Sequence, residues 1–420
     1  MIRQASGTIA ARVHITGMNL LTVMLAGHSL GPAGLGAISL VVLGITLLML
    51  PASFIGGGAL IYHVPRTAVR AMLLPAYACA LLGSLAGWGL LLLLPLVPAD
   101  MVPHVVALSF LQAVYTLHLG ILLGRRRIGQ HNLLTALQAT VLLVAFAVPV
   151  FAGPASLMDY VIASYIAFAG TVLLSAWAVL RLLMDDDVHA PLDLRALLRH
   201  GGWVTGANAL QLVNYRFAYT LVDRFQGTAM LGIYSVGNQL AESAWLAPRS
   251  LGMVLLSQVS NARQEDERTR LALLALKLSL ASAAAMLLLL LLLPGSVYTL
   301  AFGKDVTGLR PLLLLLVPGI LAMAASQAFS HYFSGTGRNR LNMVASGLGM
   351  LVTLGIGPGA VDRWGLHGAA LTASLSYITA ATLQFTVFLR ATRAPLAAFW
   401  PGRADLNRAQ AMLKGLVHGR

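Results

Sequence analysis

Long apolar stretches separated by short polar ones dominate the chain. One of them runs from Leu278 to Pro294 without a charged residue and includes seven consecutive leucines, 287–293. About 20 apolar residues are needed to cross the hydrocarbon core of a bilayer. Charged residues make up 10% of the chain, whereas roughly a quarter is usual for a protein whose surface faces water. The pattern predicts an all-α polytopic membrane protein.

The apolar stretches predict about twelve transmembrane helices joined by short loops. We place them at residues 8–27, 34–60, 71–97, 102–124, 132–152, 157–183, 201–222, 230–258, 271–293, 309–333, 341–361 and 366–389. The first stretch contains Arg12, His14 and Asn19, so it is better interpreted as a retained helix than as a cleaved signal sequence. Prolines and glycines within spans, at Pro51, Pro248 and Pro318, predict bends.

The positive charge is distributed unevenly across these spans. The net charge is +14; 22 of the 28 Lys and Arg residues fall on one predicted side and four on the other. This asymmetry predicts that both termini are cytoplasmic in a multi-pass protein of the plasma or inner membrane. It also argues against nucleic acid as the partner and favours contact with anionic membrane lipids.

The chain divides into two predicted halves. The polar segment with Asp185, Asp186 and Asp187 separates a first six-helix bundle, 1–184, from a second, 201–390, and serves as a linker, 185–200. Residues 391–420 form a basic tail that either lies on the membrane as an amphipathic segment or is disordered. At an offset of 196 residues, Gly31, Leu35, Gly36 and Ser39 match Gly227, Leu231, Gly232 and Ser235. A parallel repeat of this kind is typical of transporters with a substrate path between the halves.

Enzyme chemistry is not indicated. The chain contains no phosphate-binding loop motif, no His-Glu-x-x-His motif and one cysteine, Cys79. These motifs would carry nucleotide or metal chemistry, so we expect no cofactor other than a coupling ion, H⁺ or Na⁺.

Polar residues inside the predicted spans are the candidates for function, because charge within hydrocarbon is costly and is usually retained for a role. The candidate residues of a cationic substrate cavity are Arg12, Asn19, Asn208, Gln211, Arg216, Asn238 and Arg249; the candidate ion-coupling residues are Asp223 and Glu242. In the eighth span, Asn238, Glu242, Trp245 and Arg249 are spaced to form one line on a helix. The structural alternative is that Glu242 pairs with a nearby arginine, while Arg12 and Arg249 extend to the membrane surface.

Three segments resemble the polysaccharide-biosynthesis flippases of the MATE-like superfamily. They are SLGPAGLGAISLV at 29–41, LGIYSVGNQLAESAWLAPRSLGMVLLSQVS at 231–260, and FSGTGRNRLNM at 333–343 followed by GLHGAALTASLSY at 365–377. The resemblance implies two six-helix bundles in a V shape, alternating access, and movement of a polyprenyl-diphosphate-linked oligosaccharide to the outer leaflet through a cationic cavity. It departs from related lipid II flippases at Met18 and Asn19, where an Arg-Asp pair would fall, and at Ala218, where many relatives have an acid.

Three functions remain open at this point. A lipid-linked oligosaccharide flippase needs positive charge for a diphosphate, and Arg12, Arg216 and Arg249 supply it. A cation-coupled drug exporter of the same fold would favour acidic residues, here Glu242 and Asp223. The third reading is a scaffold for a polysaccharide-assembly complex, and contact with a polymerase or other assembly protein is compatible with all three. The excess of arginine favours the flippase.

Overall fold

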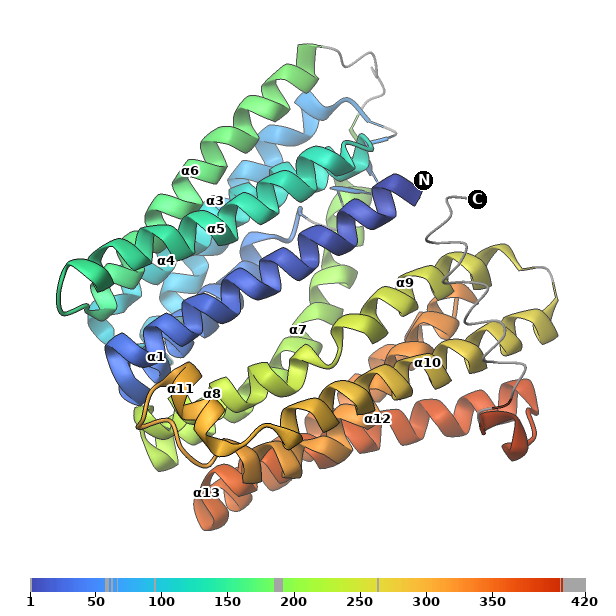
Figure 1. Cartoon of the computed structure of the whole chain (residues 1–420). Coiled ribbons are helices and arrows are strands. Elements are labelled where there is room, and N and C mark those ends of the chain that lie inside the picture. Colours follow the sequence, from blue (N-terminus) through green and yellow to red (C-terminus); the bar gives the residue numbers. More distant parts are fainter. Residues whose placement is uncertain are drawn as a thin grey trace. The chain divides into compact units, whose positions relative to one another are not determined.

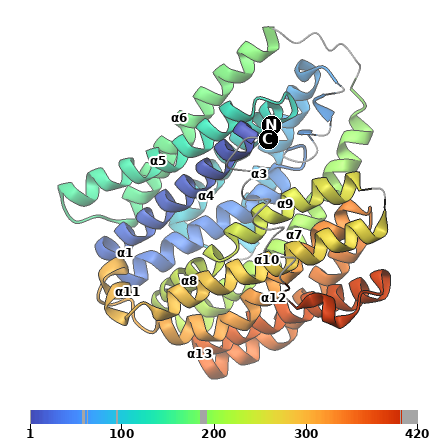
Figure 2. The same cartoon turned by 45° about the vertical axis from the view of Figure 1, so that its right-hand side comes forward.

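The computed structural model of the chain describes residues 2–56, 60–61, 63–65, 67–93, 96–184, 192–262, 264–400 and 402. Every regular element among these residues is helical (Figures 1 and 2). The elements are α1 Ile2–Ala52, α3 Val69–Leu93, η1 Ala99–Met101, α4 Val102–Gly124, α5 Ile128–Ala152, α6 Leu157–Met184, α7 Leu194–Gln226, α8 Thr228–Ser243, α9 Leu246–Asn261, α10 Glu265–Leu292, α11 Gly295–Phe302, α12 Leu309–Gly335, α13 Asn339–Thr392 and η2 Leu396–Phe399. Helices satisfy their own backbone groups, which hydrocarbon requires of a spanning segment.

Within the described residues, eight helices are long and apolar enough to cross a membrane. They confirm an all-helical, multi-span membrane protein. Two of the eight, α1 and α13, are of about double length, with apolar segments of 43 and 53 residues. α7 is long but rich in polar residues, and α8 and α9 have 16 residues each.

Each double-length helix is interrupted at a glycine. Gly31 in α1 has φ 66° and ψ −172°, and Gly365 in α13 has φ 54° and ψ −131°. The breaks fall between the predicted spans 8–27 and 34–60, and between 341–361 and 366–389. Positive φ with extended ψ is open to glycine and strained for other residues, so these two glycines decide where the chain changes direction.

Gly31 and Gly227, which match at the repeat offset of 196 residues, have similar backbone conformations. Gly227, which precedes α8, has φ 85° and ψ 166°, close to the values at Gly31, the position that matches it in the first half. Each glycine stands before a segment whose Leu and Gly residues also match. The two segments therefore agree in local geometry as well as in sequence.

The predicted eighth span, 230–258, is not one helix. α8 ends at Ser243 and α9 begins at Leu246, with a turn in which Trp245 N–H donates to the Glu242 carbonyl at 2.9 Å. Pro248 explains the break: proline lacks an N–H, and its ring clashes with the carbonyl four residues earlier in a continuous helix, here that of Ala244. The expected bend at Pro248 is thus a full interruption.

The described residues form two compact units. One comprises Arg3–Leu212 with Ala301–Lys304, and the other Val213–Leu300 with the described part of Asp305–Arg420. The division falls inside α7. The sequence places the junction at 185–200, and residues 185–191 of that segment lie outside the described part of the chain.

A buried histidine ties three helices of the first unit together. In His118 on α4, Nε2 lies 2.6 Å from the Tyr77 hydroxyl of α3, and Nδ1 lies 2.8 Å from Ser175 Oγ of α6. Ser175 donates its own proton to the Val172 carbonyl at 3.0 Å, so it accepts from Nδ1–H, and Tyr77 donates to Nε2. A neutral imidazole, with one donor and one acceptor nitrogen, satisfies this arrangement.

A second buried polar cluster holds α7 to both segments of α13 in the second unit. Asn214 Oδ1 accepts hydrogen bonds from Thr353 Oγ1 at 2.9 Å and from Ser376 Oγ at 2.7 Å. Thr353 precedes the break at Gly365 and Ser376 follows it. The three polar side chains are at most 6% exposed, so their hydrogen bonds fix α7 against α13 two residues before Arg216.

Candidate functional site

The candidate site centres on Arg216, on α7 in the second unit. Its Nη1 donates to the Tyr219 hydroxyl at 2.6 Å, and its Nη2 lies 3.5 Å from Glu242 Oε2 in an ion pair. Tyr219 lies one turn further along α7, so the helix period places its hydroxyl beside the guanidinium. Its ring also lies under Arg216, at 4.9 Å from guanidinium carbon to ring centroid.

Asn238 positions the Glu242 carboxylate. Its Nδ2 donates to Glu242 Oε1 at 2.7 Å and to the Tyr219 hydroxyl at 3.4 Å. Asn238 and Glu242 are four residues apart on α8 and therefore share one face. Asn238 is 1% exposed, so the amide is fixed. The two carboxylate oxygens of Glu242 thus have different partners, Asn238 for one and Arg216 for the other.

The ion pair is partly open. The Arg216 side chain is 31% exposed and that of Glu242 is 19% exposed, whereas Tyr219 and Tyr234 below them are buried in edge-to-face contact at 5.6 Å between ring centroids. Guanidinium has five N–H donors in a planar fork that suits phosphate and carboxylate oxygens. An anion can therefore approach Arg216 from its exposed side while Tyr219 holds the other.

The structure brings together Arg216, Glu242 and Asn238 among the predicted residues. It realises the pairing of Glu242 with an arginine that the sequence left as the structural alternative. Tyr219 completes the cluster, although it is not among the candidate residues selected from the sequence. Its spacing of three residues from Arg216 was the available signal.

Arg249 lies beyond the interruption before Pro248, on a different helix from Asn238 and Glu242. The expected line assumed one continuous helix, and the role of Arg249 in a substrate cavity stays a prediction. Arg249 lies on α9, is exposed, and has its guanidinium carbon 5.5 Å from the Trp245 ring centroid. The Trp245 indole N–H donates to the Ile320 carbonyl of α12 at 3.3 Å.

Asp223 has a local structural contact. Its Oδ1 accepts a hydrogen bond from Thr228 Oγ1 at 2.8 Å across the turn between α7 and α8. The turn contains Gly227 and its positive φ. The assignment of Asp223 to ion coupling stays a prediction.

Arg12 and Asn19 belong to the first unit, on α1. Arg12 is half-buried and Asn19 is exposed. On the same helix, His14 Nε2 lies 2.8 Å from Thr140 Oγ1 of α5, and Asn132 Nδ2 of α5 donates to Thr8 Oγ1 at 3.0 Å. The role of Arg12 and Asn19 in a substrate cavity stays a prediction.

Two predicted residues and the tail cannot be placed in the site. Asn208 and Gln211 lie on α7, and their side chains are outside the described part of the structure, as are residues 403–420. Among the described residues, no group of three or more His, Cys, Asp or Glu side chains could hold a metal ion.

The fold matches that of solved transporters. A multidrug resistance MATE family transporter of the MOP superfamily, in an inward-facing conformation, superposes with a TM-score of 0.68 at 15% identity, covering 90% of this chain and 94% of that one. A mutant of the Vibrio cholerae MATE transporter VcmN superposes with a TM-score of 0.64 at 15% identity, covering 95% and 97%. The chain has the fold of these MATE transporters.

The same fold includes a lipid flippase. Lipid II flippase MurJ, in an inward closed conformation, matches with a TM-score of 0.68 at 13% identity, covering 93% of this chain and 88% of that one. No protein-family model and no curated protein sequence matches this chain. At these identities the MOP superfamily likeness concerns the fold, and the substrate must be argued from the site.

Proposed function

We propose that the protein is a transporter that moves a polyprenyl-diphosphate-linked oligosaccharide from the cytoplasmic to the outer leaflet by alternating access. The observation that carries the proposal is the partly exposed Arg216 guanidinium, held within a spanning bundle by Tyr219 and Glu242. A diphosphate and its glycan cannot cross hydrocarbon unaided, because unpaired charge there is costly. A fixed guanidinium offers the diphosphate paired hydrogen bonds and opposite charge.

The proposed architecture follows from the helices. α1 and α13 each supply two spans across their glycine breaks, α7 supplies one, and α8 with α9 supplies one interrupted span. With α3, α4, α5, α6, α10 and α12 as one span each, the proposed architecture has twelve spans in two six-helix bundles. The Lys and Arg asymmetry supports cytoplasmic termini in the plasma or inner membrane.

Glu242 competes with the substrate for Arg216 in the proposed transport cycle. The carboxylate occupies one side of Arg216, so an incoming diphosphate competes with it for the guanidinium. Displacement of the carboxylate from Arg216 would leave the guanidinium to the diphosphate, and its return would favour release. The Asn238 amide holds the other carboxylate oxygen of Glu242. Ion coupling through Glu242 is therefore part of the proposal.

A cation-coupled multidrug exporter is the second candidate function. Glu242 favours it, because a partly exposed carboxylate beside the buried rings of Tyr219 and Tyr234 is a setting that suits an organic cation. The MATE structures that match the chain include multidrug transporters. Arg216 argues against it, since its charge opposes that of the cation at 3.5 Å from the carboxylate.

The deciding experiment measures the leaflet distribution of lipid-linked oligosaccharide in cells with and without the protein. A membrane-impermeant glycan-modifying reagent labels outward-facing lipid. We expect the reagent-protected intermediate to accumulate without the protein and to disappear on expression of the wild type or of Arg224→Ala. Arg224 is exposed at the end of α7 and is the matched control. Arg216→Ala should insert normally and fail to restore labelling.

An unchanged distribution in cells lacking the protein would refute the flippase. The exporter would then be tested by sensitivity to organic cations. Normal transport by Arg216→Ala, with the flippase otherwise established, would reject the role of Arg216 alone.

A further inference from the structure

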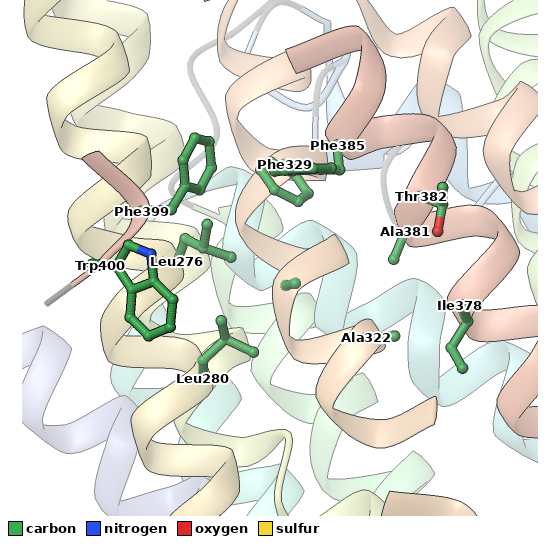
Figure 3. Close-up of a pocket in the computed structure, with 11 residues that line it drawn as sticks. Leu276, Leu280, Ala322, Phe329, Ile378, Ala381, Thr382, Phe385, Phe399 and Trp400 are labelled. Carbon is green, nitrogen blue, oxygen red and sulfur yellow. The ribbon is translucent and has the colours of Figure 1, made fainter. Parts of the chain in front are cut away.

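An elongated cavity of about 580 Å³ opens on the second unit between α10, α12, α13 and η2. Small side chains on two helices create the space, namely Ala322 and Ala325 on α12 and Ala381 on α13. Leu276 and Leu280 of α10 form the opposite wall, beside the segment that returns after α13 (Figure 3).

Aromatic side chains close one end of this cavity. Phe385 of α13 lies 6.0 Å from Phe329 of α12 and 5.3 Å from Phe399 of η2, measured between ring centroids. Trp400 follows Phe399 at the rim and is 78% exposed. Figure 3 shows the rings of Phe399 and Trp400 beside Leu276 and Leu280. η2 thus forms an aromatic lip on the cavity.

The cavity follows the helix axes. Its lining extends over residues 322–329 of α12 and 378–385 of α13, which on each helix is a rise of about 10 Å at about 1.5 Å per residue. α10, α12 and α13 are all among the membrane-spanning candidates. The cavity is therefore elongated in the direction in which lipid chains lie.

Its lining is suited to hydrocarbon. Of the residues that line it, Thr382 is the one with a polar side-chain oxygen or nitrogen other than the indole of Trp400 at the rim. Water needs two to four polar partners to be held in a cavity. A chain of methylene groups needs no polar partner.

The aromatic end is also the charged end. α13 ends at Thr392, and Arg390 and Arg393 are exposed there. Tryptophan and arginine are enriched where hydrocarbon meets head groups, and clustered basic residues attract anionic lipid. The acidic residues at the start of α10 are near the same end, but Glu265 is already bonded to Tyr332 and Arg268.

The occupant is separate from the transported substrate. The residues that line the cavity come from α10, α12, α13 and the η2 segment. None comes from α7 or α8, which hold Arg216 and Glu242.

We propose that this cavity binds one acyl chain of an anionic bilayer phospholipid. The head group lies toward the C-terminal end of α13, where Arg390 and Arg393 are exposed, and the chain extends past Phe385 along the cavity. This site does not depend on the proposed transport function.

Native mass spectrometry of the purified full-length protein with phosphatidylglycerol and phosphatidylcholine tests the site. We expect one phosphatidylglycerol to bind more tightly than phosphatidylcholine. Ala322→Leu with Ala325→Leu fills the cavity and should weaken that lipid at least tenfold. Ala284→Leu with Ala285→Leu is the matched control, because both alanines are exposed on α10 outside the cavity. Arg390→Gln with Arg393→Gln should remove the preference for phosphatidylglycerol.

A second measurement needs no filled cavity. Phosphatidylglycerol brominated on its acyl chains should quench Trp400, with the signal identified by its loss in Trp400→Phe. The proposal would be overturned if Ala322→Leu with Ala325→Leu retained phosphatidylglycerol as well as the wild type, or if Trp400 were not quenched. Tighter competition at this site by undecaprenyl phosphate than by phosphatidylglycerol would overturn the choice of occupant.

Discussion

Arg216 of α7 and Glu242 of α8 form an ion pair, 3.5 Å from Nη2 to Oε2, that is partly exposed on one side and backed by buried tyrosines on the other. An ion pair within a membrane bundle usually balances charge. Here both members keep exposed surface, so each is accessible to an outside ligand. The pair sets up the first prediction.

Glu242→Gln should strengthen the binding of polyprenyl diphosphate. The substitution removes the charge that competes for Arg216 and keeps an amide oxygen for the Asn238 bond. We expect about a tenfold lower Kd, equivalent to about 1.4 kcal/mol. Titration of polyprenyl diphosphate into the protein in nanodiscs measures the Kd. Glu267→Gln, at an exposed position in the first turn of α10, is the control and should leave the Kd unchanged; weaker binding by Glu242→Gln would contradict the competition.

Gly31→Ala and Gly227→Ala should each destabilise the protein. At both positions a Cβ would meet nothing within 4 Å, so crowding is not the cause. The cost comes from positive φ with extended ψ, about 1–3 kcal/mol for a residue other than glycine. Thermal unfolding in detergent should show a lower midpoint for both. Gly89→Ala, in open space on α3 with ordinary dihedrals, should not lower it. Equal stability of all three would contradict the argument.

His118→Leu should destabilise the first unit. It removes the hydrogen bonds to Tyr77 and Ser175, and hydrogen bonds between membrane helices contribute about 0.6 kcal/mol each, up to about 1.7. We expect a loss of roughly 1–3 kcal/mol, seen as a lower unfolding midpoint or faster hydrogen exchange in α3 and α6. His14→Leu, at an exposed hydrogen bond to Thr140, is the comparison and should cost less. A greater loss of stability from His14→Leu would contradict the structural role of His118.

The sequence predicted the class of the fold because hydrocarbon imposes a simple rule. Spans must be apolar for about 20 residues and helical throughout, and both conditions can be read without knowing which helix packs on which. The breaks at Gly31 and Gly365 likewise fall between predicted spans. The interruption before Pro248 was underestimated, because proline in a span is compatible with either a bend or a break.

The candidate site was predicted in part. Arg216, Glu242 and Asn238 were selected because polar side chains inside a predicted span are usually retained for a function. In the structure, Glu242 contacts both Arg216 and Asn238. The role of Arg249 stays a prediction, because the helix that would align it with Glu242 is interrupted before Pro248 and helical spacing holds only while a helix continues.

By itself, the sequence determined that this protein is a multi-span helical membrane protein, and it predicted an excess of arginine on one side. These properties follow from the composition and the order of residues along the chain, because the preference of each side chain for hydrocarbon or water does not depend on which helices pack together. The tertiary structure decided which charges meet: that Glu242 faces Arg216 rather than Arg249, that Asn214 joins Thr353 and Ser376, and that alanines and η2 leave a cavity. Such contacts depend on how helices distant in sequence pack together. Helical periodicity predicts which residues share one face of a helix, but it does not predict which other helix packs on that face.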